Sequence, residues 1–125
     1  MSSSSSGPID LRGALVDGFA SAAEQHGEAT ADGDHERANK AFRTLSRLAL
    51  QIEGRRSETV AIVDELYLRP HPSVRSWAAV LGLSVSPSKA IEVLQDVANE
   101  YRGLVGFGAE MLIAEYNAGR FKKPW

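Results

Sequence analysis

The fold is decided by one stretch, His71-Pro72-Ser73-Val74-Arg75-Ser76-Trp77-Ala78-Ala79-Val80-Leu81-Gly82-Leu83. Pro72 stands where the first N–H groups of a helix are unpaired, so its missing N–H costs nothing there. The apolar residues recur every three or four positions and therefore share one face: Val74, Trp77, Ala78 and Leu81. Gly82 follows them and is expected to end the helix in a left-handed conformation. The stretch predicts a short, heavily buried helix. We expect the helices of the chain to form three pairs, with Trp77 buried between the second pair and the third.

Five further segments show apolar residues at helical spacing. They cover roughly residues 9–30, 34–54, 57–70, 86–101 and 109–118. Asp34 and Ser86 are the expected N-caps of two of them. A loose, glycine-rich hinge is expected at residues 103–108, and its apolar residues Leu104, Val105 and Phe107 require burial. Nothing alternates with period two, so we predict an all-α fold of about six helices in three antiparallel pairs.

The chain has 125 residues, which is the size of one domain. Residues 1–8 are read as a flexible serine-rich tail, residues 9–119 as a single helical domain, and residues 120–125 as a basic, aromatic tail. The net charge of -2 argues against a general attraction to nucleic acid or acidic lipid. No apolar run is long enough to cross a membrane, and no signal peptide is recognisable, so a cytoplasmic protein is expected.

Paired helices with one apolar face each must stack on their neighbours, as in an α-solenoid. The segment from Pro72 to Gly82 resembles the second helix of a HEAT repeat, and the segment from Ser86 to Leu94 resembles the first helix of the next. Two features depart from that pattern. His71 stands where HEAT repeats usually carry aspartate, and Leu81-Gly82 comes one residue early. We therefore expect a short HEAT-like superhelix and not a regular HEAT array.

A closer resemblance covers most of the chain from about His26. It is carried by four strings in order: His26-Gly27-Glu28-Ala29, Gly33-Asp34-His35-Glu36-Arg37-Ala38-Asn39-Lys40-Ala41, Val74-Arg75-Ser76-Trp77-Ala78-Ala79 and Ala109-Glu110-Met111-Leu112. They resemble a small bacterial family with HEAT-like helices that is catalogued as a domain of unknown function. The resemblance implies a fold and little activity. Small bacterial helical-repeat proteins of this kind are often immunity partners of secreted toxins.

The residues that could carry chemistry are few. The chain has no cysteine, and its three histidines show no metal-binding spacing. His26 is expected to be a core histidine hydrogen-bonded to the second helix, and His71 a turn residue. The run Asp32-Gly33-Asp34 lacks the length of a calcium loop and is better explained by helix capping. We predict no catalytic residue, no cofactor, no metal and no enzymatic activity.

The best surface signal is basic. Between His35 and Arg56 there are six arginine or lysine residues against two glutamates. Such a row is either a solvated helix face or a contact face for an acidic partner. If the second helices of successive pairs line one concave side, that side carries the candidate partner-binding residues Lys40, Arg43, Arg47, Arg75 and Glu110.

The leading hypothesis is a non-enzymatic protein-binding module, an immunity or adaptor protein that binds one partner, such as a toxin, on this concave charged face. One alternative is a small nucleic-acid-binding helical repeat, which the lack of aromatic residues among the arginines disfavours. A second alternative is a non-catalytic subunit of an enzyme complex. If the basic row is only solvated, the other exposed surface to consider is the tail from Phe121 to Trp125.

Overall fold

A computed structural model describes residues 10–125, and within this range the fold is all-α, as predicted. The elements are α1 (Leu11–Ala31), α2 (His35–Gly54), a short 3-10 helix η1 (Arg56–Glu58), α3 (Thr59–Tyr67), α4 (Pro72–Gly82), α5 (Pro87–Glu100) and α6 (Leu104–Asn117). The tail predicted at residues 1–8 lies outside the described residues. None of the described helices is both long and apolar enough to span a bilayer.

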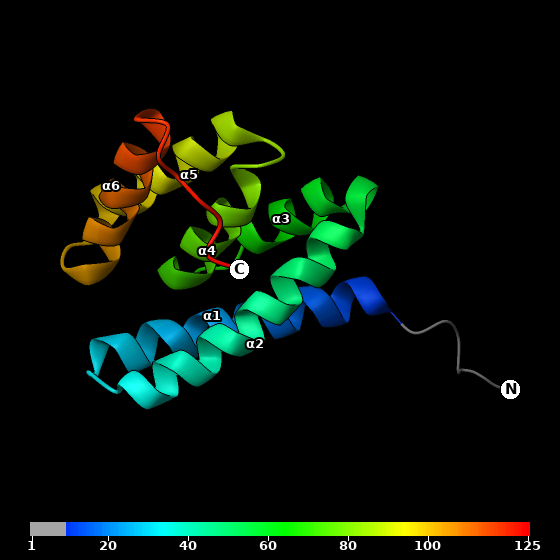
Figure 1. Ribbon diagram of the computed structural model, residues 1–125, viewed down its shortest axis with the longest axis horizontal. Coiled ribbons are helices and arrows are strands. Elements are labelled where there is room, and N and C mark those ends of the chain that lie inside the picture. Colours follow the sequence, from blue (N-terminus) through cyan, green and yellow to red (C-terminus); the bar gives the residue numbers. More distant parts are fainter. Residues whose placement is uncertain (1–9) are drawn as a thin grey trace, which may run out of the picture.

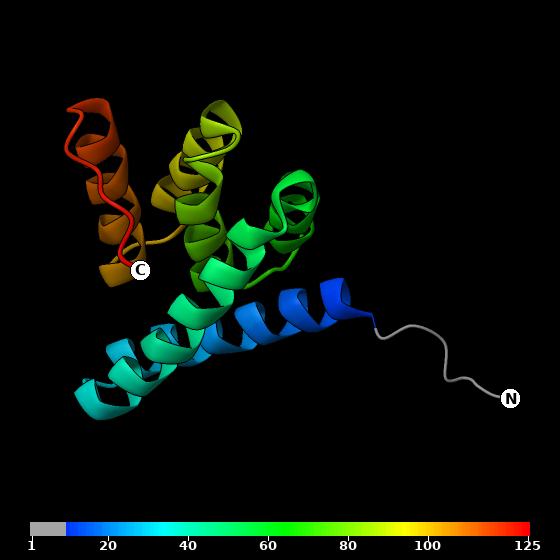
Figure 2. The same cartoon turned by 45° about the vertical axis from the view of Figure 1, so that its right-hand side comes forward.

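The two long helices α1 and α2 form one hairpin, and the four shorter helices lie together on one side of it (Figure 1). Consecutive helices pack on each other, and α4 lies at the centre because it contacts α1, α3, α5 and α6. Figure 2 shows α6 at the far end of the row, in contact mainly with α5. The stretch that decides the fold in the sequence is therefore also the central helix of the structure.

Two groups of buried side chains form the core, and α4 contributes to both. The first joins α1, α2, α3 and α4 and contains fully buried Phe19, Leu45 and Leu66. The second joins α4, α5 and α6 around Ala79 and Leu94. Opposite sides of α4 thus connect the long hairpin to the last two helices.

The helix caps agree only in part with those expected from the sequence. Asp34 caps α2 as predicted, since its side chain accepts a hydrogen bond from the N–H of Arg37 at 3.1 Å. His71 is a turn residue as predicted, and its Nδ1 caps α4 by accepting from the N–H of Ser73 at 3.1 Å. Ser86 does not cap α5 through its side chain, and its buried hydroxyl has no partner among the described residues. Ser86 is nevertheless the N-cap residue of α5 as predicted, and its backbone carbonyl accepts from the N–H of Ala90 at 3.1 Å.

Gly82 does not adopt the left-handed conformation that the sequence suggested. It remains helical, and Leu83 follows it as a right-handed C-cap. A Cβ added at Gly82 would overlap the Tyr67 hydroxyl and crowd Ala90. Glycine is needed here because α3 and α5 approach α4 closely, which is a packing requirement and not a turn requirement.

The predicted hinge at residues 103–108 is also wrong, because α6 already begins at Leu104. Gly103 has a φ of 78° and turns the chain out of α5. Gly106 is buried, and a Cβ there would overlap the carbonyl oxygen of Tyr101. Glycine in this helix allows contact with the end of α5 that no other residue permits. The exposed fractions of Leu104 and Phe107, 64% and 59%, contradict the expectation that they are buried.

Trp77 is half-buried and does not lie between the second and third helix pairs. Its ring lies 5.3 Å from His26 of α1, 5.8 Å from Phe42 of α2 and 6.4 Å from Trp125 at the C-terminus. Trp77 packs against the same core group as Val74, Ala78 and Leu81, next to the long hairpin. This position places it at the edge of a surface cleft.

Candidate functional site: an apolar cleft closed by the C-terminal segment

A cleft of about 560 Å³ lies between the C-terminal part of α1, one side of α4, one side of α6 and the chain after α6. Its walls are mostly apolar. The larger apolar side chains that line it are Trp77, Val80, Leu104, Val105, Met111, Leu112 and Phe121. The cleft exists because α6 packs mainly on α5 and makes little contact with α4.

A few polar groups stand among these apolar walls. Thr30 of α1 and Ser73 and Ser76 of α4 supply hydroxyl groups, and Glu115 and Arg120 form an ion pair at 3.2 Å. The Ser76 oxygen is buried and has no hydrogen-bond partner among the described residues. No hydrogen bond in the described range joins a serine, a histidine and a carboxylate here, so the groups of a nucleophilic triad are not assembled.

His26 lies where the cleft meets the long hairpin. The expected hydrogen bond to α2 does not form among residues 10–125. The imidazole packs against the rings of Phe42, at 6.3 Å, and Trp77. Burial among these rings lowers the pKa of His26 from its ordinary value of 6.5, because the charged form loses hydration. His26 thus makes aromatic contacts with Phe42 and Trp77 instead of the hydrogen bond to α2 that its position in the helix predicted.

The lowered pKa of His26 predicts a pH dependence of stability. Unfolded His26 binds a proton at its ordinary pKa of 6.5, whereas the folded protein binds it only at lower pH. The contribution to stability is therefore complete above pH 6.5 and is lost as pH falls through the folded pKa. Urea unfolding measured from about pH 7.5 to about pH 5 is expected to show this loss. His26→Gln should reduce the slope, and equal slopes in wild type and His26→Gln would contradict the assignment.

The predicted basic row of α2 lies on the face opposite the buried stripe of that helix. Lys40, Arg43 and Arg47 are exposed and form no ion pair with any described residue. Arg37 instead pairs with Asp32 at 3.5 Å and with Glu28 at 3.7 Å. Lys40, Arg43 and Arg47 line neither of the two hollows found on the other described elements.

The structure does not join Arg75 or Glu110 to this row. Arg75 is largely covered and lies against the end of α5, 3.7 Å from the carboxylate of Glu100, with its guanidinium 5.8 Å from the ring centre of Tyr101. Glu110 is exposed on the side of α6 that carries Phe107, away from the cleft.

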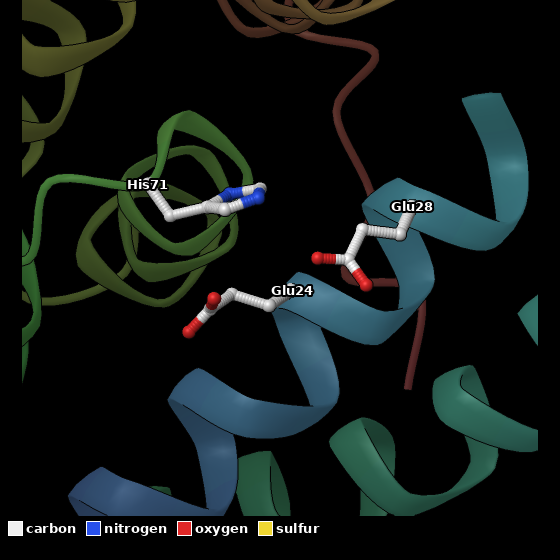
Figure 3. Close-up of side chains that lie close together, drawn as sticks. All are labelled: Glu24, Glu28 and His71. Carbon is white, nitrogen blue, oxygen red and sulfur yellow. The ribbon is translucent and has the colours of Figure 1, made fainter.

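A second group of side chains was not expected from the sequence. Glu24 and Glu28 project one turn apart from α1 towards His71, and their ligand atoms lie within 4.8 Å of one another (Figure 3). Two carboxylates and an imidazole could in principle hold a divalent cation.

The cap on α4 opposes metal binding at this group. The Nδ1 atom of His71 accepts the N–H of Ser73, so the neutral ring carries its proton on Nε2. Coordination through Nε2 would move that proton to Nδ1 and break the cap. Glu28 is also paired with Arg37. The three side chains are therefore better described as the Nε2–H group of His71 next to the carboxylates of Glu24 and Glu28 than as a metal centre.

We therefore expect that adding zinc or EDTA leaves the melting temperature unchanged. The measurement is thermal unfolding followed by circular dichroism, in the presence of each reagent. The informative control is Glu24→Gln with Glu28→Gln. A zinc-dependent increase in melting temperature that disappears in this variant would show that the three residues bind metal.

Comparison with known proteins bears on the fold and not on an activity. The sequence model of a family described as "Domain of unknown function (DUF2019)" matches residues 13–115. The crystal structure of the protein RPA1889 from Rhodopseudomonas palustris CGA009 is similar, with a TM-score of 0.82 and 25% sequence identity. That match covers 91% of this chain and 94% of the other chain. No curated protein matches the sequence.

Proposed function

The chain belongs to the DUF2019 family, whose function is unknown, and we propose that it is a protein-binding module whose apolar cleft binds an amphipathic helix of one partner. The observation that carries the proposal is the cleft itself, a hollow of about 560 Å³ with mostly apolar walls. A surface hollow of this composition marks a binding site more often than an unused surface. Immunity proteins and adaptors both act through one such contact, and we propose the cytoplasm as its compartment.

The spacing of the exposed residues supports a helical partner. Leu104 and Met111 lie on the side of α6 that faces the cleft, with exposed fractions of 64% and 45%. They are two helical turns apart, which is about 10.5 Å along the axis. Helices that bind in grooves place apolar anchors at matching intervals of three, four and seven residues. Burial of these two side chains supplies the driving force for association.

The charges at the edge of the cleft favour an acidic partner. Arg120 and Lys122 both line the cleft, and Arg120 is neutralised by Glu115. Lys122 is exposed and has no ion pair with any described residue. A carboxylate beside the apolar anchors of the partner would pair with Lys122, and such a pair at an interface edge increases the association rate more than the affinity.

The α2 row supports a partner less well than the cleft does. Lys40, Arg43 and Arg47 are exposed, and the half-buried ring of Phe42 lies 5.8 Å from that of Trp77. Nucleic-acid binding through this row would require exposed aromatic residues for stacking, which α2 lacks. The isolated polar groups of the cleft likewise support a non-enzymatic role.

Site-specific photo-crosslinking tests the proposal. A photoreactive amino acid at position 111 should capture one protein from extracts of the source organism. The same amino acid at position 107 is the matched control, because Phe107 lies on α6 with 59% exposure but does not line the cleft. Position 43 tests the α2 row. Capture from position 43 alone, or equally from all three positions, would contradict binding in the cleft.

A further inference from the structure

The segment that follows α6 crosses the cleft and is attached at both ends. At its start, Gly119 has a φ of 75°, which turns the chain back over α6. The N–H of Arg120 donates to the carbonyl of Glu115 at 2.9 Å, and the ring of Phe121 lies 6.4 Å from that of Tyr116. This first attachment fixes the segment to the last turns of α6.

The second attachment joins the end of the segment to the long hairpin and α4. Both oxygens of Glu53, in the last turn of α2, take part. Lys123 lies 3.0 Å from one oxygen, and the indole N–H of Trp125 donates to the other at 3.2 Å. The Trp125 ring also packs against Trp77, at 6.4 Å. One carboxylate therefore holds the end of the chain.

Between the two attachments the segment forms a wall of the cleft. Arg120, Phe121, Lys122 and Pro124 all line it. Figure 1 shows the segment running from the end of α6 towards α4 as an extended strand of chain without helical structure. The side chains of Lys123 and Glu53 remain partly exposed, at 44% and 22%. Partly exposed ion pairs contribute little, so this attachment can open while the helices remain folded.

We infer that residues 119–125 form a strap that Glu53 latches over the cleft, and that opening of this latch controls access to it. The inference rests on the proposed function, because it assigns regulation to the same cleft. With the latch closed, Phe121 and Pro124 line the cleft and the Trp125 ring packs on Trp77, so the end of the segment limits the space open to a partner helix. With the latch open, the segment remains attached at Phe121 and swings away from Trp77. Part of the binding free energy of the partner is then used to break the Glu53 contacts, which lowers the apparent affinity.

Limited digestion of the full-length protein with trypsin tests the latch without any partner. Trypsin can cut the strap after Arg120 and after Lys122, whereas the bond between Lys123 and Pro124 is resistant. The bond after Lys122 is the one that opening of the latch should expose. Glu53→Ala removes both latch contacts and should accelerate release of the peptide 123–125, measured by mass spectrometry, by about fivefold or more. Glu65→Ala is the matched control. It also removes a partly exposed carboxylate and one ion pair, to Arg12 at 3.2 Å, but far from the strap, and should leave this rate unchanged.

Binding of the apolar dye anilinonaphthalene sulfonate gives a second readout. Its fluorescence should increase in Glu53→Ala, remain at the wild-type level in Glu65→Ala, and decrease again when Leu104→Asp is added to Glu53→Ala. Lys123→Ala removes only one of the two contacts of Glu53 and should change both readouts in the same direction by a smaller amount, which keeps the test available if Glu53→Ala folds poorly. Unchanged release and unchanged dye binding in both latch variants would overturn the strap. That result would not affect crosslinking from position 111, so failure of the strap and failure of the proposed function are distinguishable.

Discussion

Replacement of Phe19 by alanine is expected to lower the free energy of unfolding by about 3–5 kcal/mol. Phe19 has no exposed surface and belongs to the core group that joins α1 to α2, α3 and α4. Removing its ring leaves a cavity between helices that are fixed by their other contacts, so the site cannot collapse fully. Urea unfolding of the purified variant measures the loss.

The matched control is Leu68→Ala, because Leu68 is a large apolar residue with 85% exposure. Its replacement should change the free energy of unfolding by less than about 0.5 kcal/mol. If Phe19→Ala and Leu68→Ala had similar effects, the packing of the long hairpin on α3 and α4 would be wrong. The cleft would then lose the α1 wall that this packing positions.

The second large effect is expected at Gly106, where replacement by alanine should cost about 2 kcal/mol or more. The added Cβ would overlap the carbonyl oxygen of Tyr101, which is a backbone atom and cannot rotate away. The start of α6 must therefore move off the end of α5. This outcome opposes the ordinary preference of a helix for alanine over glycine, which is about 1 kcal/mol.

Gly108 in the same helix provides the control, because a Cβ there meets no atom within 4 Å. Gly108→Ala should leave stability unchanged or increase it by up to about 1 kcal/mol. Differential scanning calorimetry of the two variants compares them directly. Equal stabilisation by both substitutions would show that α6 does not approach α5 as closely as described.

Local signals in the sequence were sufficient for the order of the helices, although α6 begins at Leu104, before the start at 109 that the sequence predicted. The apolar spacing from Val74 to Leu81, with Pro72 before it, predicted the start of α4, but the helix includes Gly82, which was expected to end it. Asp34 marked the start of α2 because an N-cap acts within four residues of chain. The predicted likeness to a domain of unknown function is confirmed, and the HEAT-like superhelix stays a prediction.

Roles that depend on contacts between distant segments could not be predicted in this way. Gly82 and Gly106 resembled punctuation, yet each is required because another helix passes close to its backbone. Leu104 and Phe107 resembled core residues because they are apolar, but among the described helices α6 packs mainly on α5, and both side chains remain exposed. A sequence shows that a side chain is apolar but not whether a neighbour exists to bury it.

The candidate site shows the same difference between local patterns, which the sequence reveals, and contacts between distant segments, which it does not. The basic row of α2 is a local pattern and is present, but Arg75 turns to Glu100 and Tyr101 instead of joining it. The cleft brings together α1, α4, α6 and the C-terminal segment, which are separated along the chain. The one signal for it in the sequence was the apolar, aromatic character of Leu104, Phe121 and Trp125 outside the regular helical stripes.

The central claim, that the cleft binds the partner, is tested most directly by the dissociation constant of the protein captured from position 111. Isothermal titration calorimetry should compare wild type, Leu104→Asp with Met111→Asp, and Phe107→Asp. Two charges placed on the cleft wall should weaken binding on the order of 100-fold, as loss of central apolar contacts usually does. Phe107→Asp should bind as wild type does. Wild-type affinity in the double variant, with normal folding, would contradict the account.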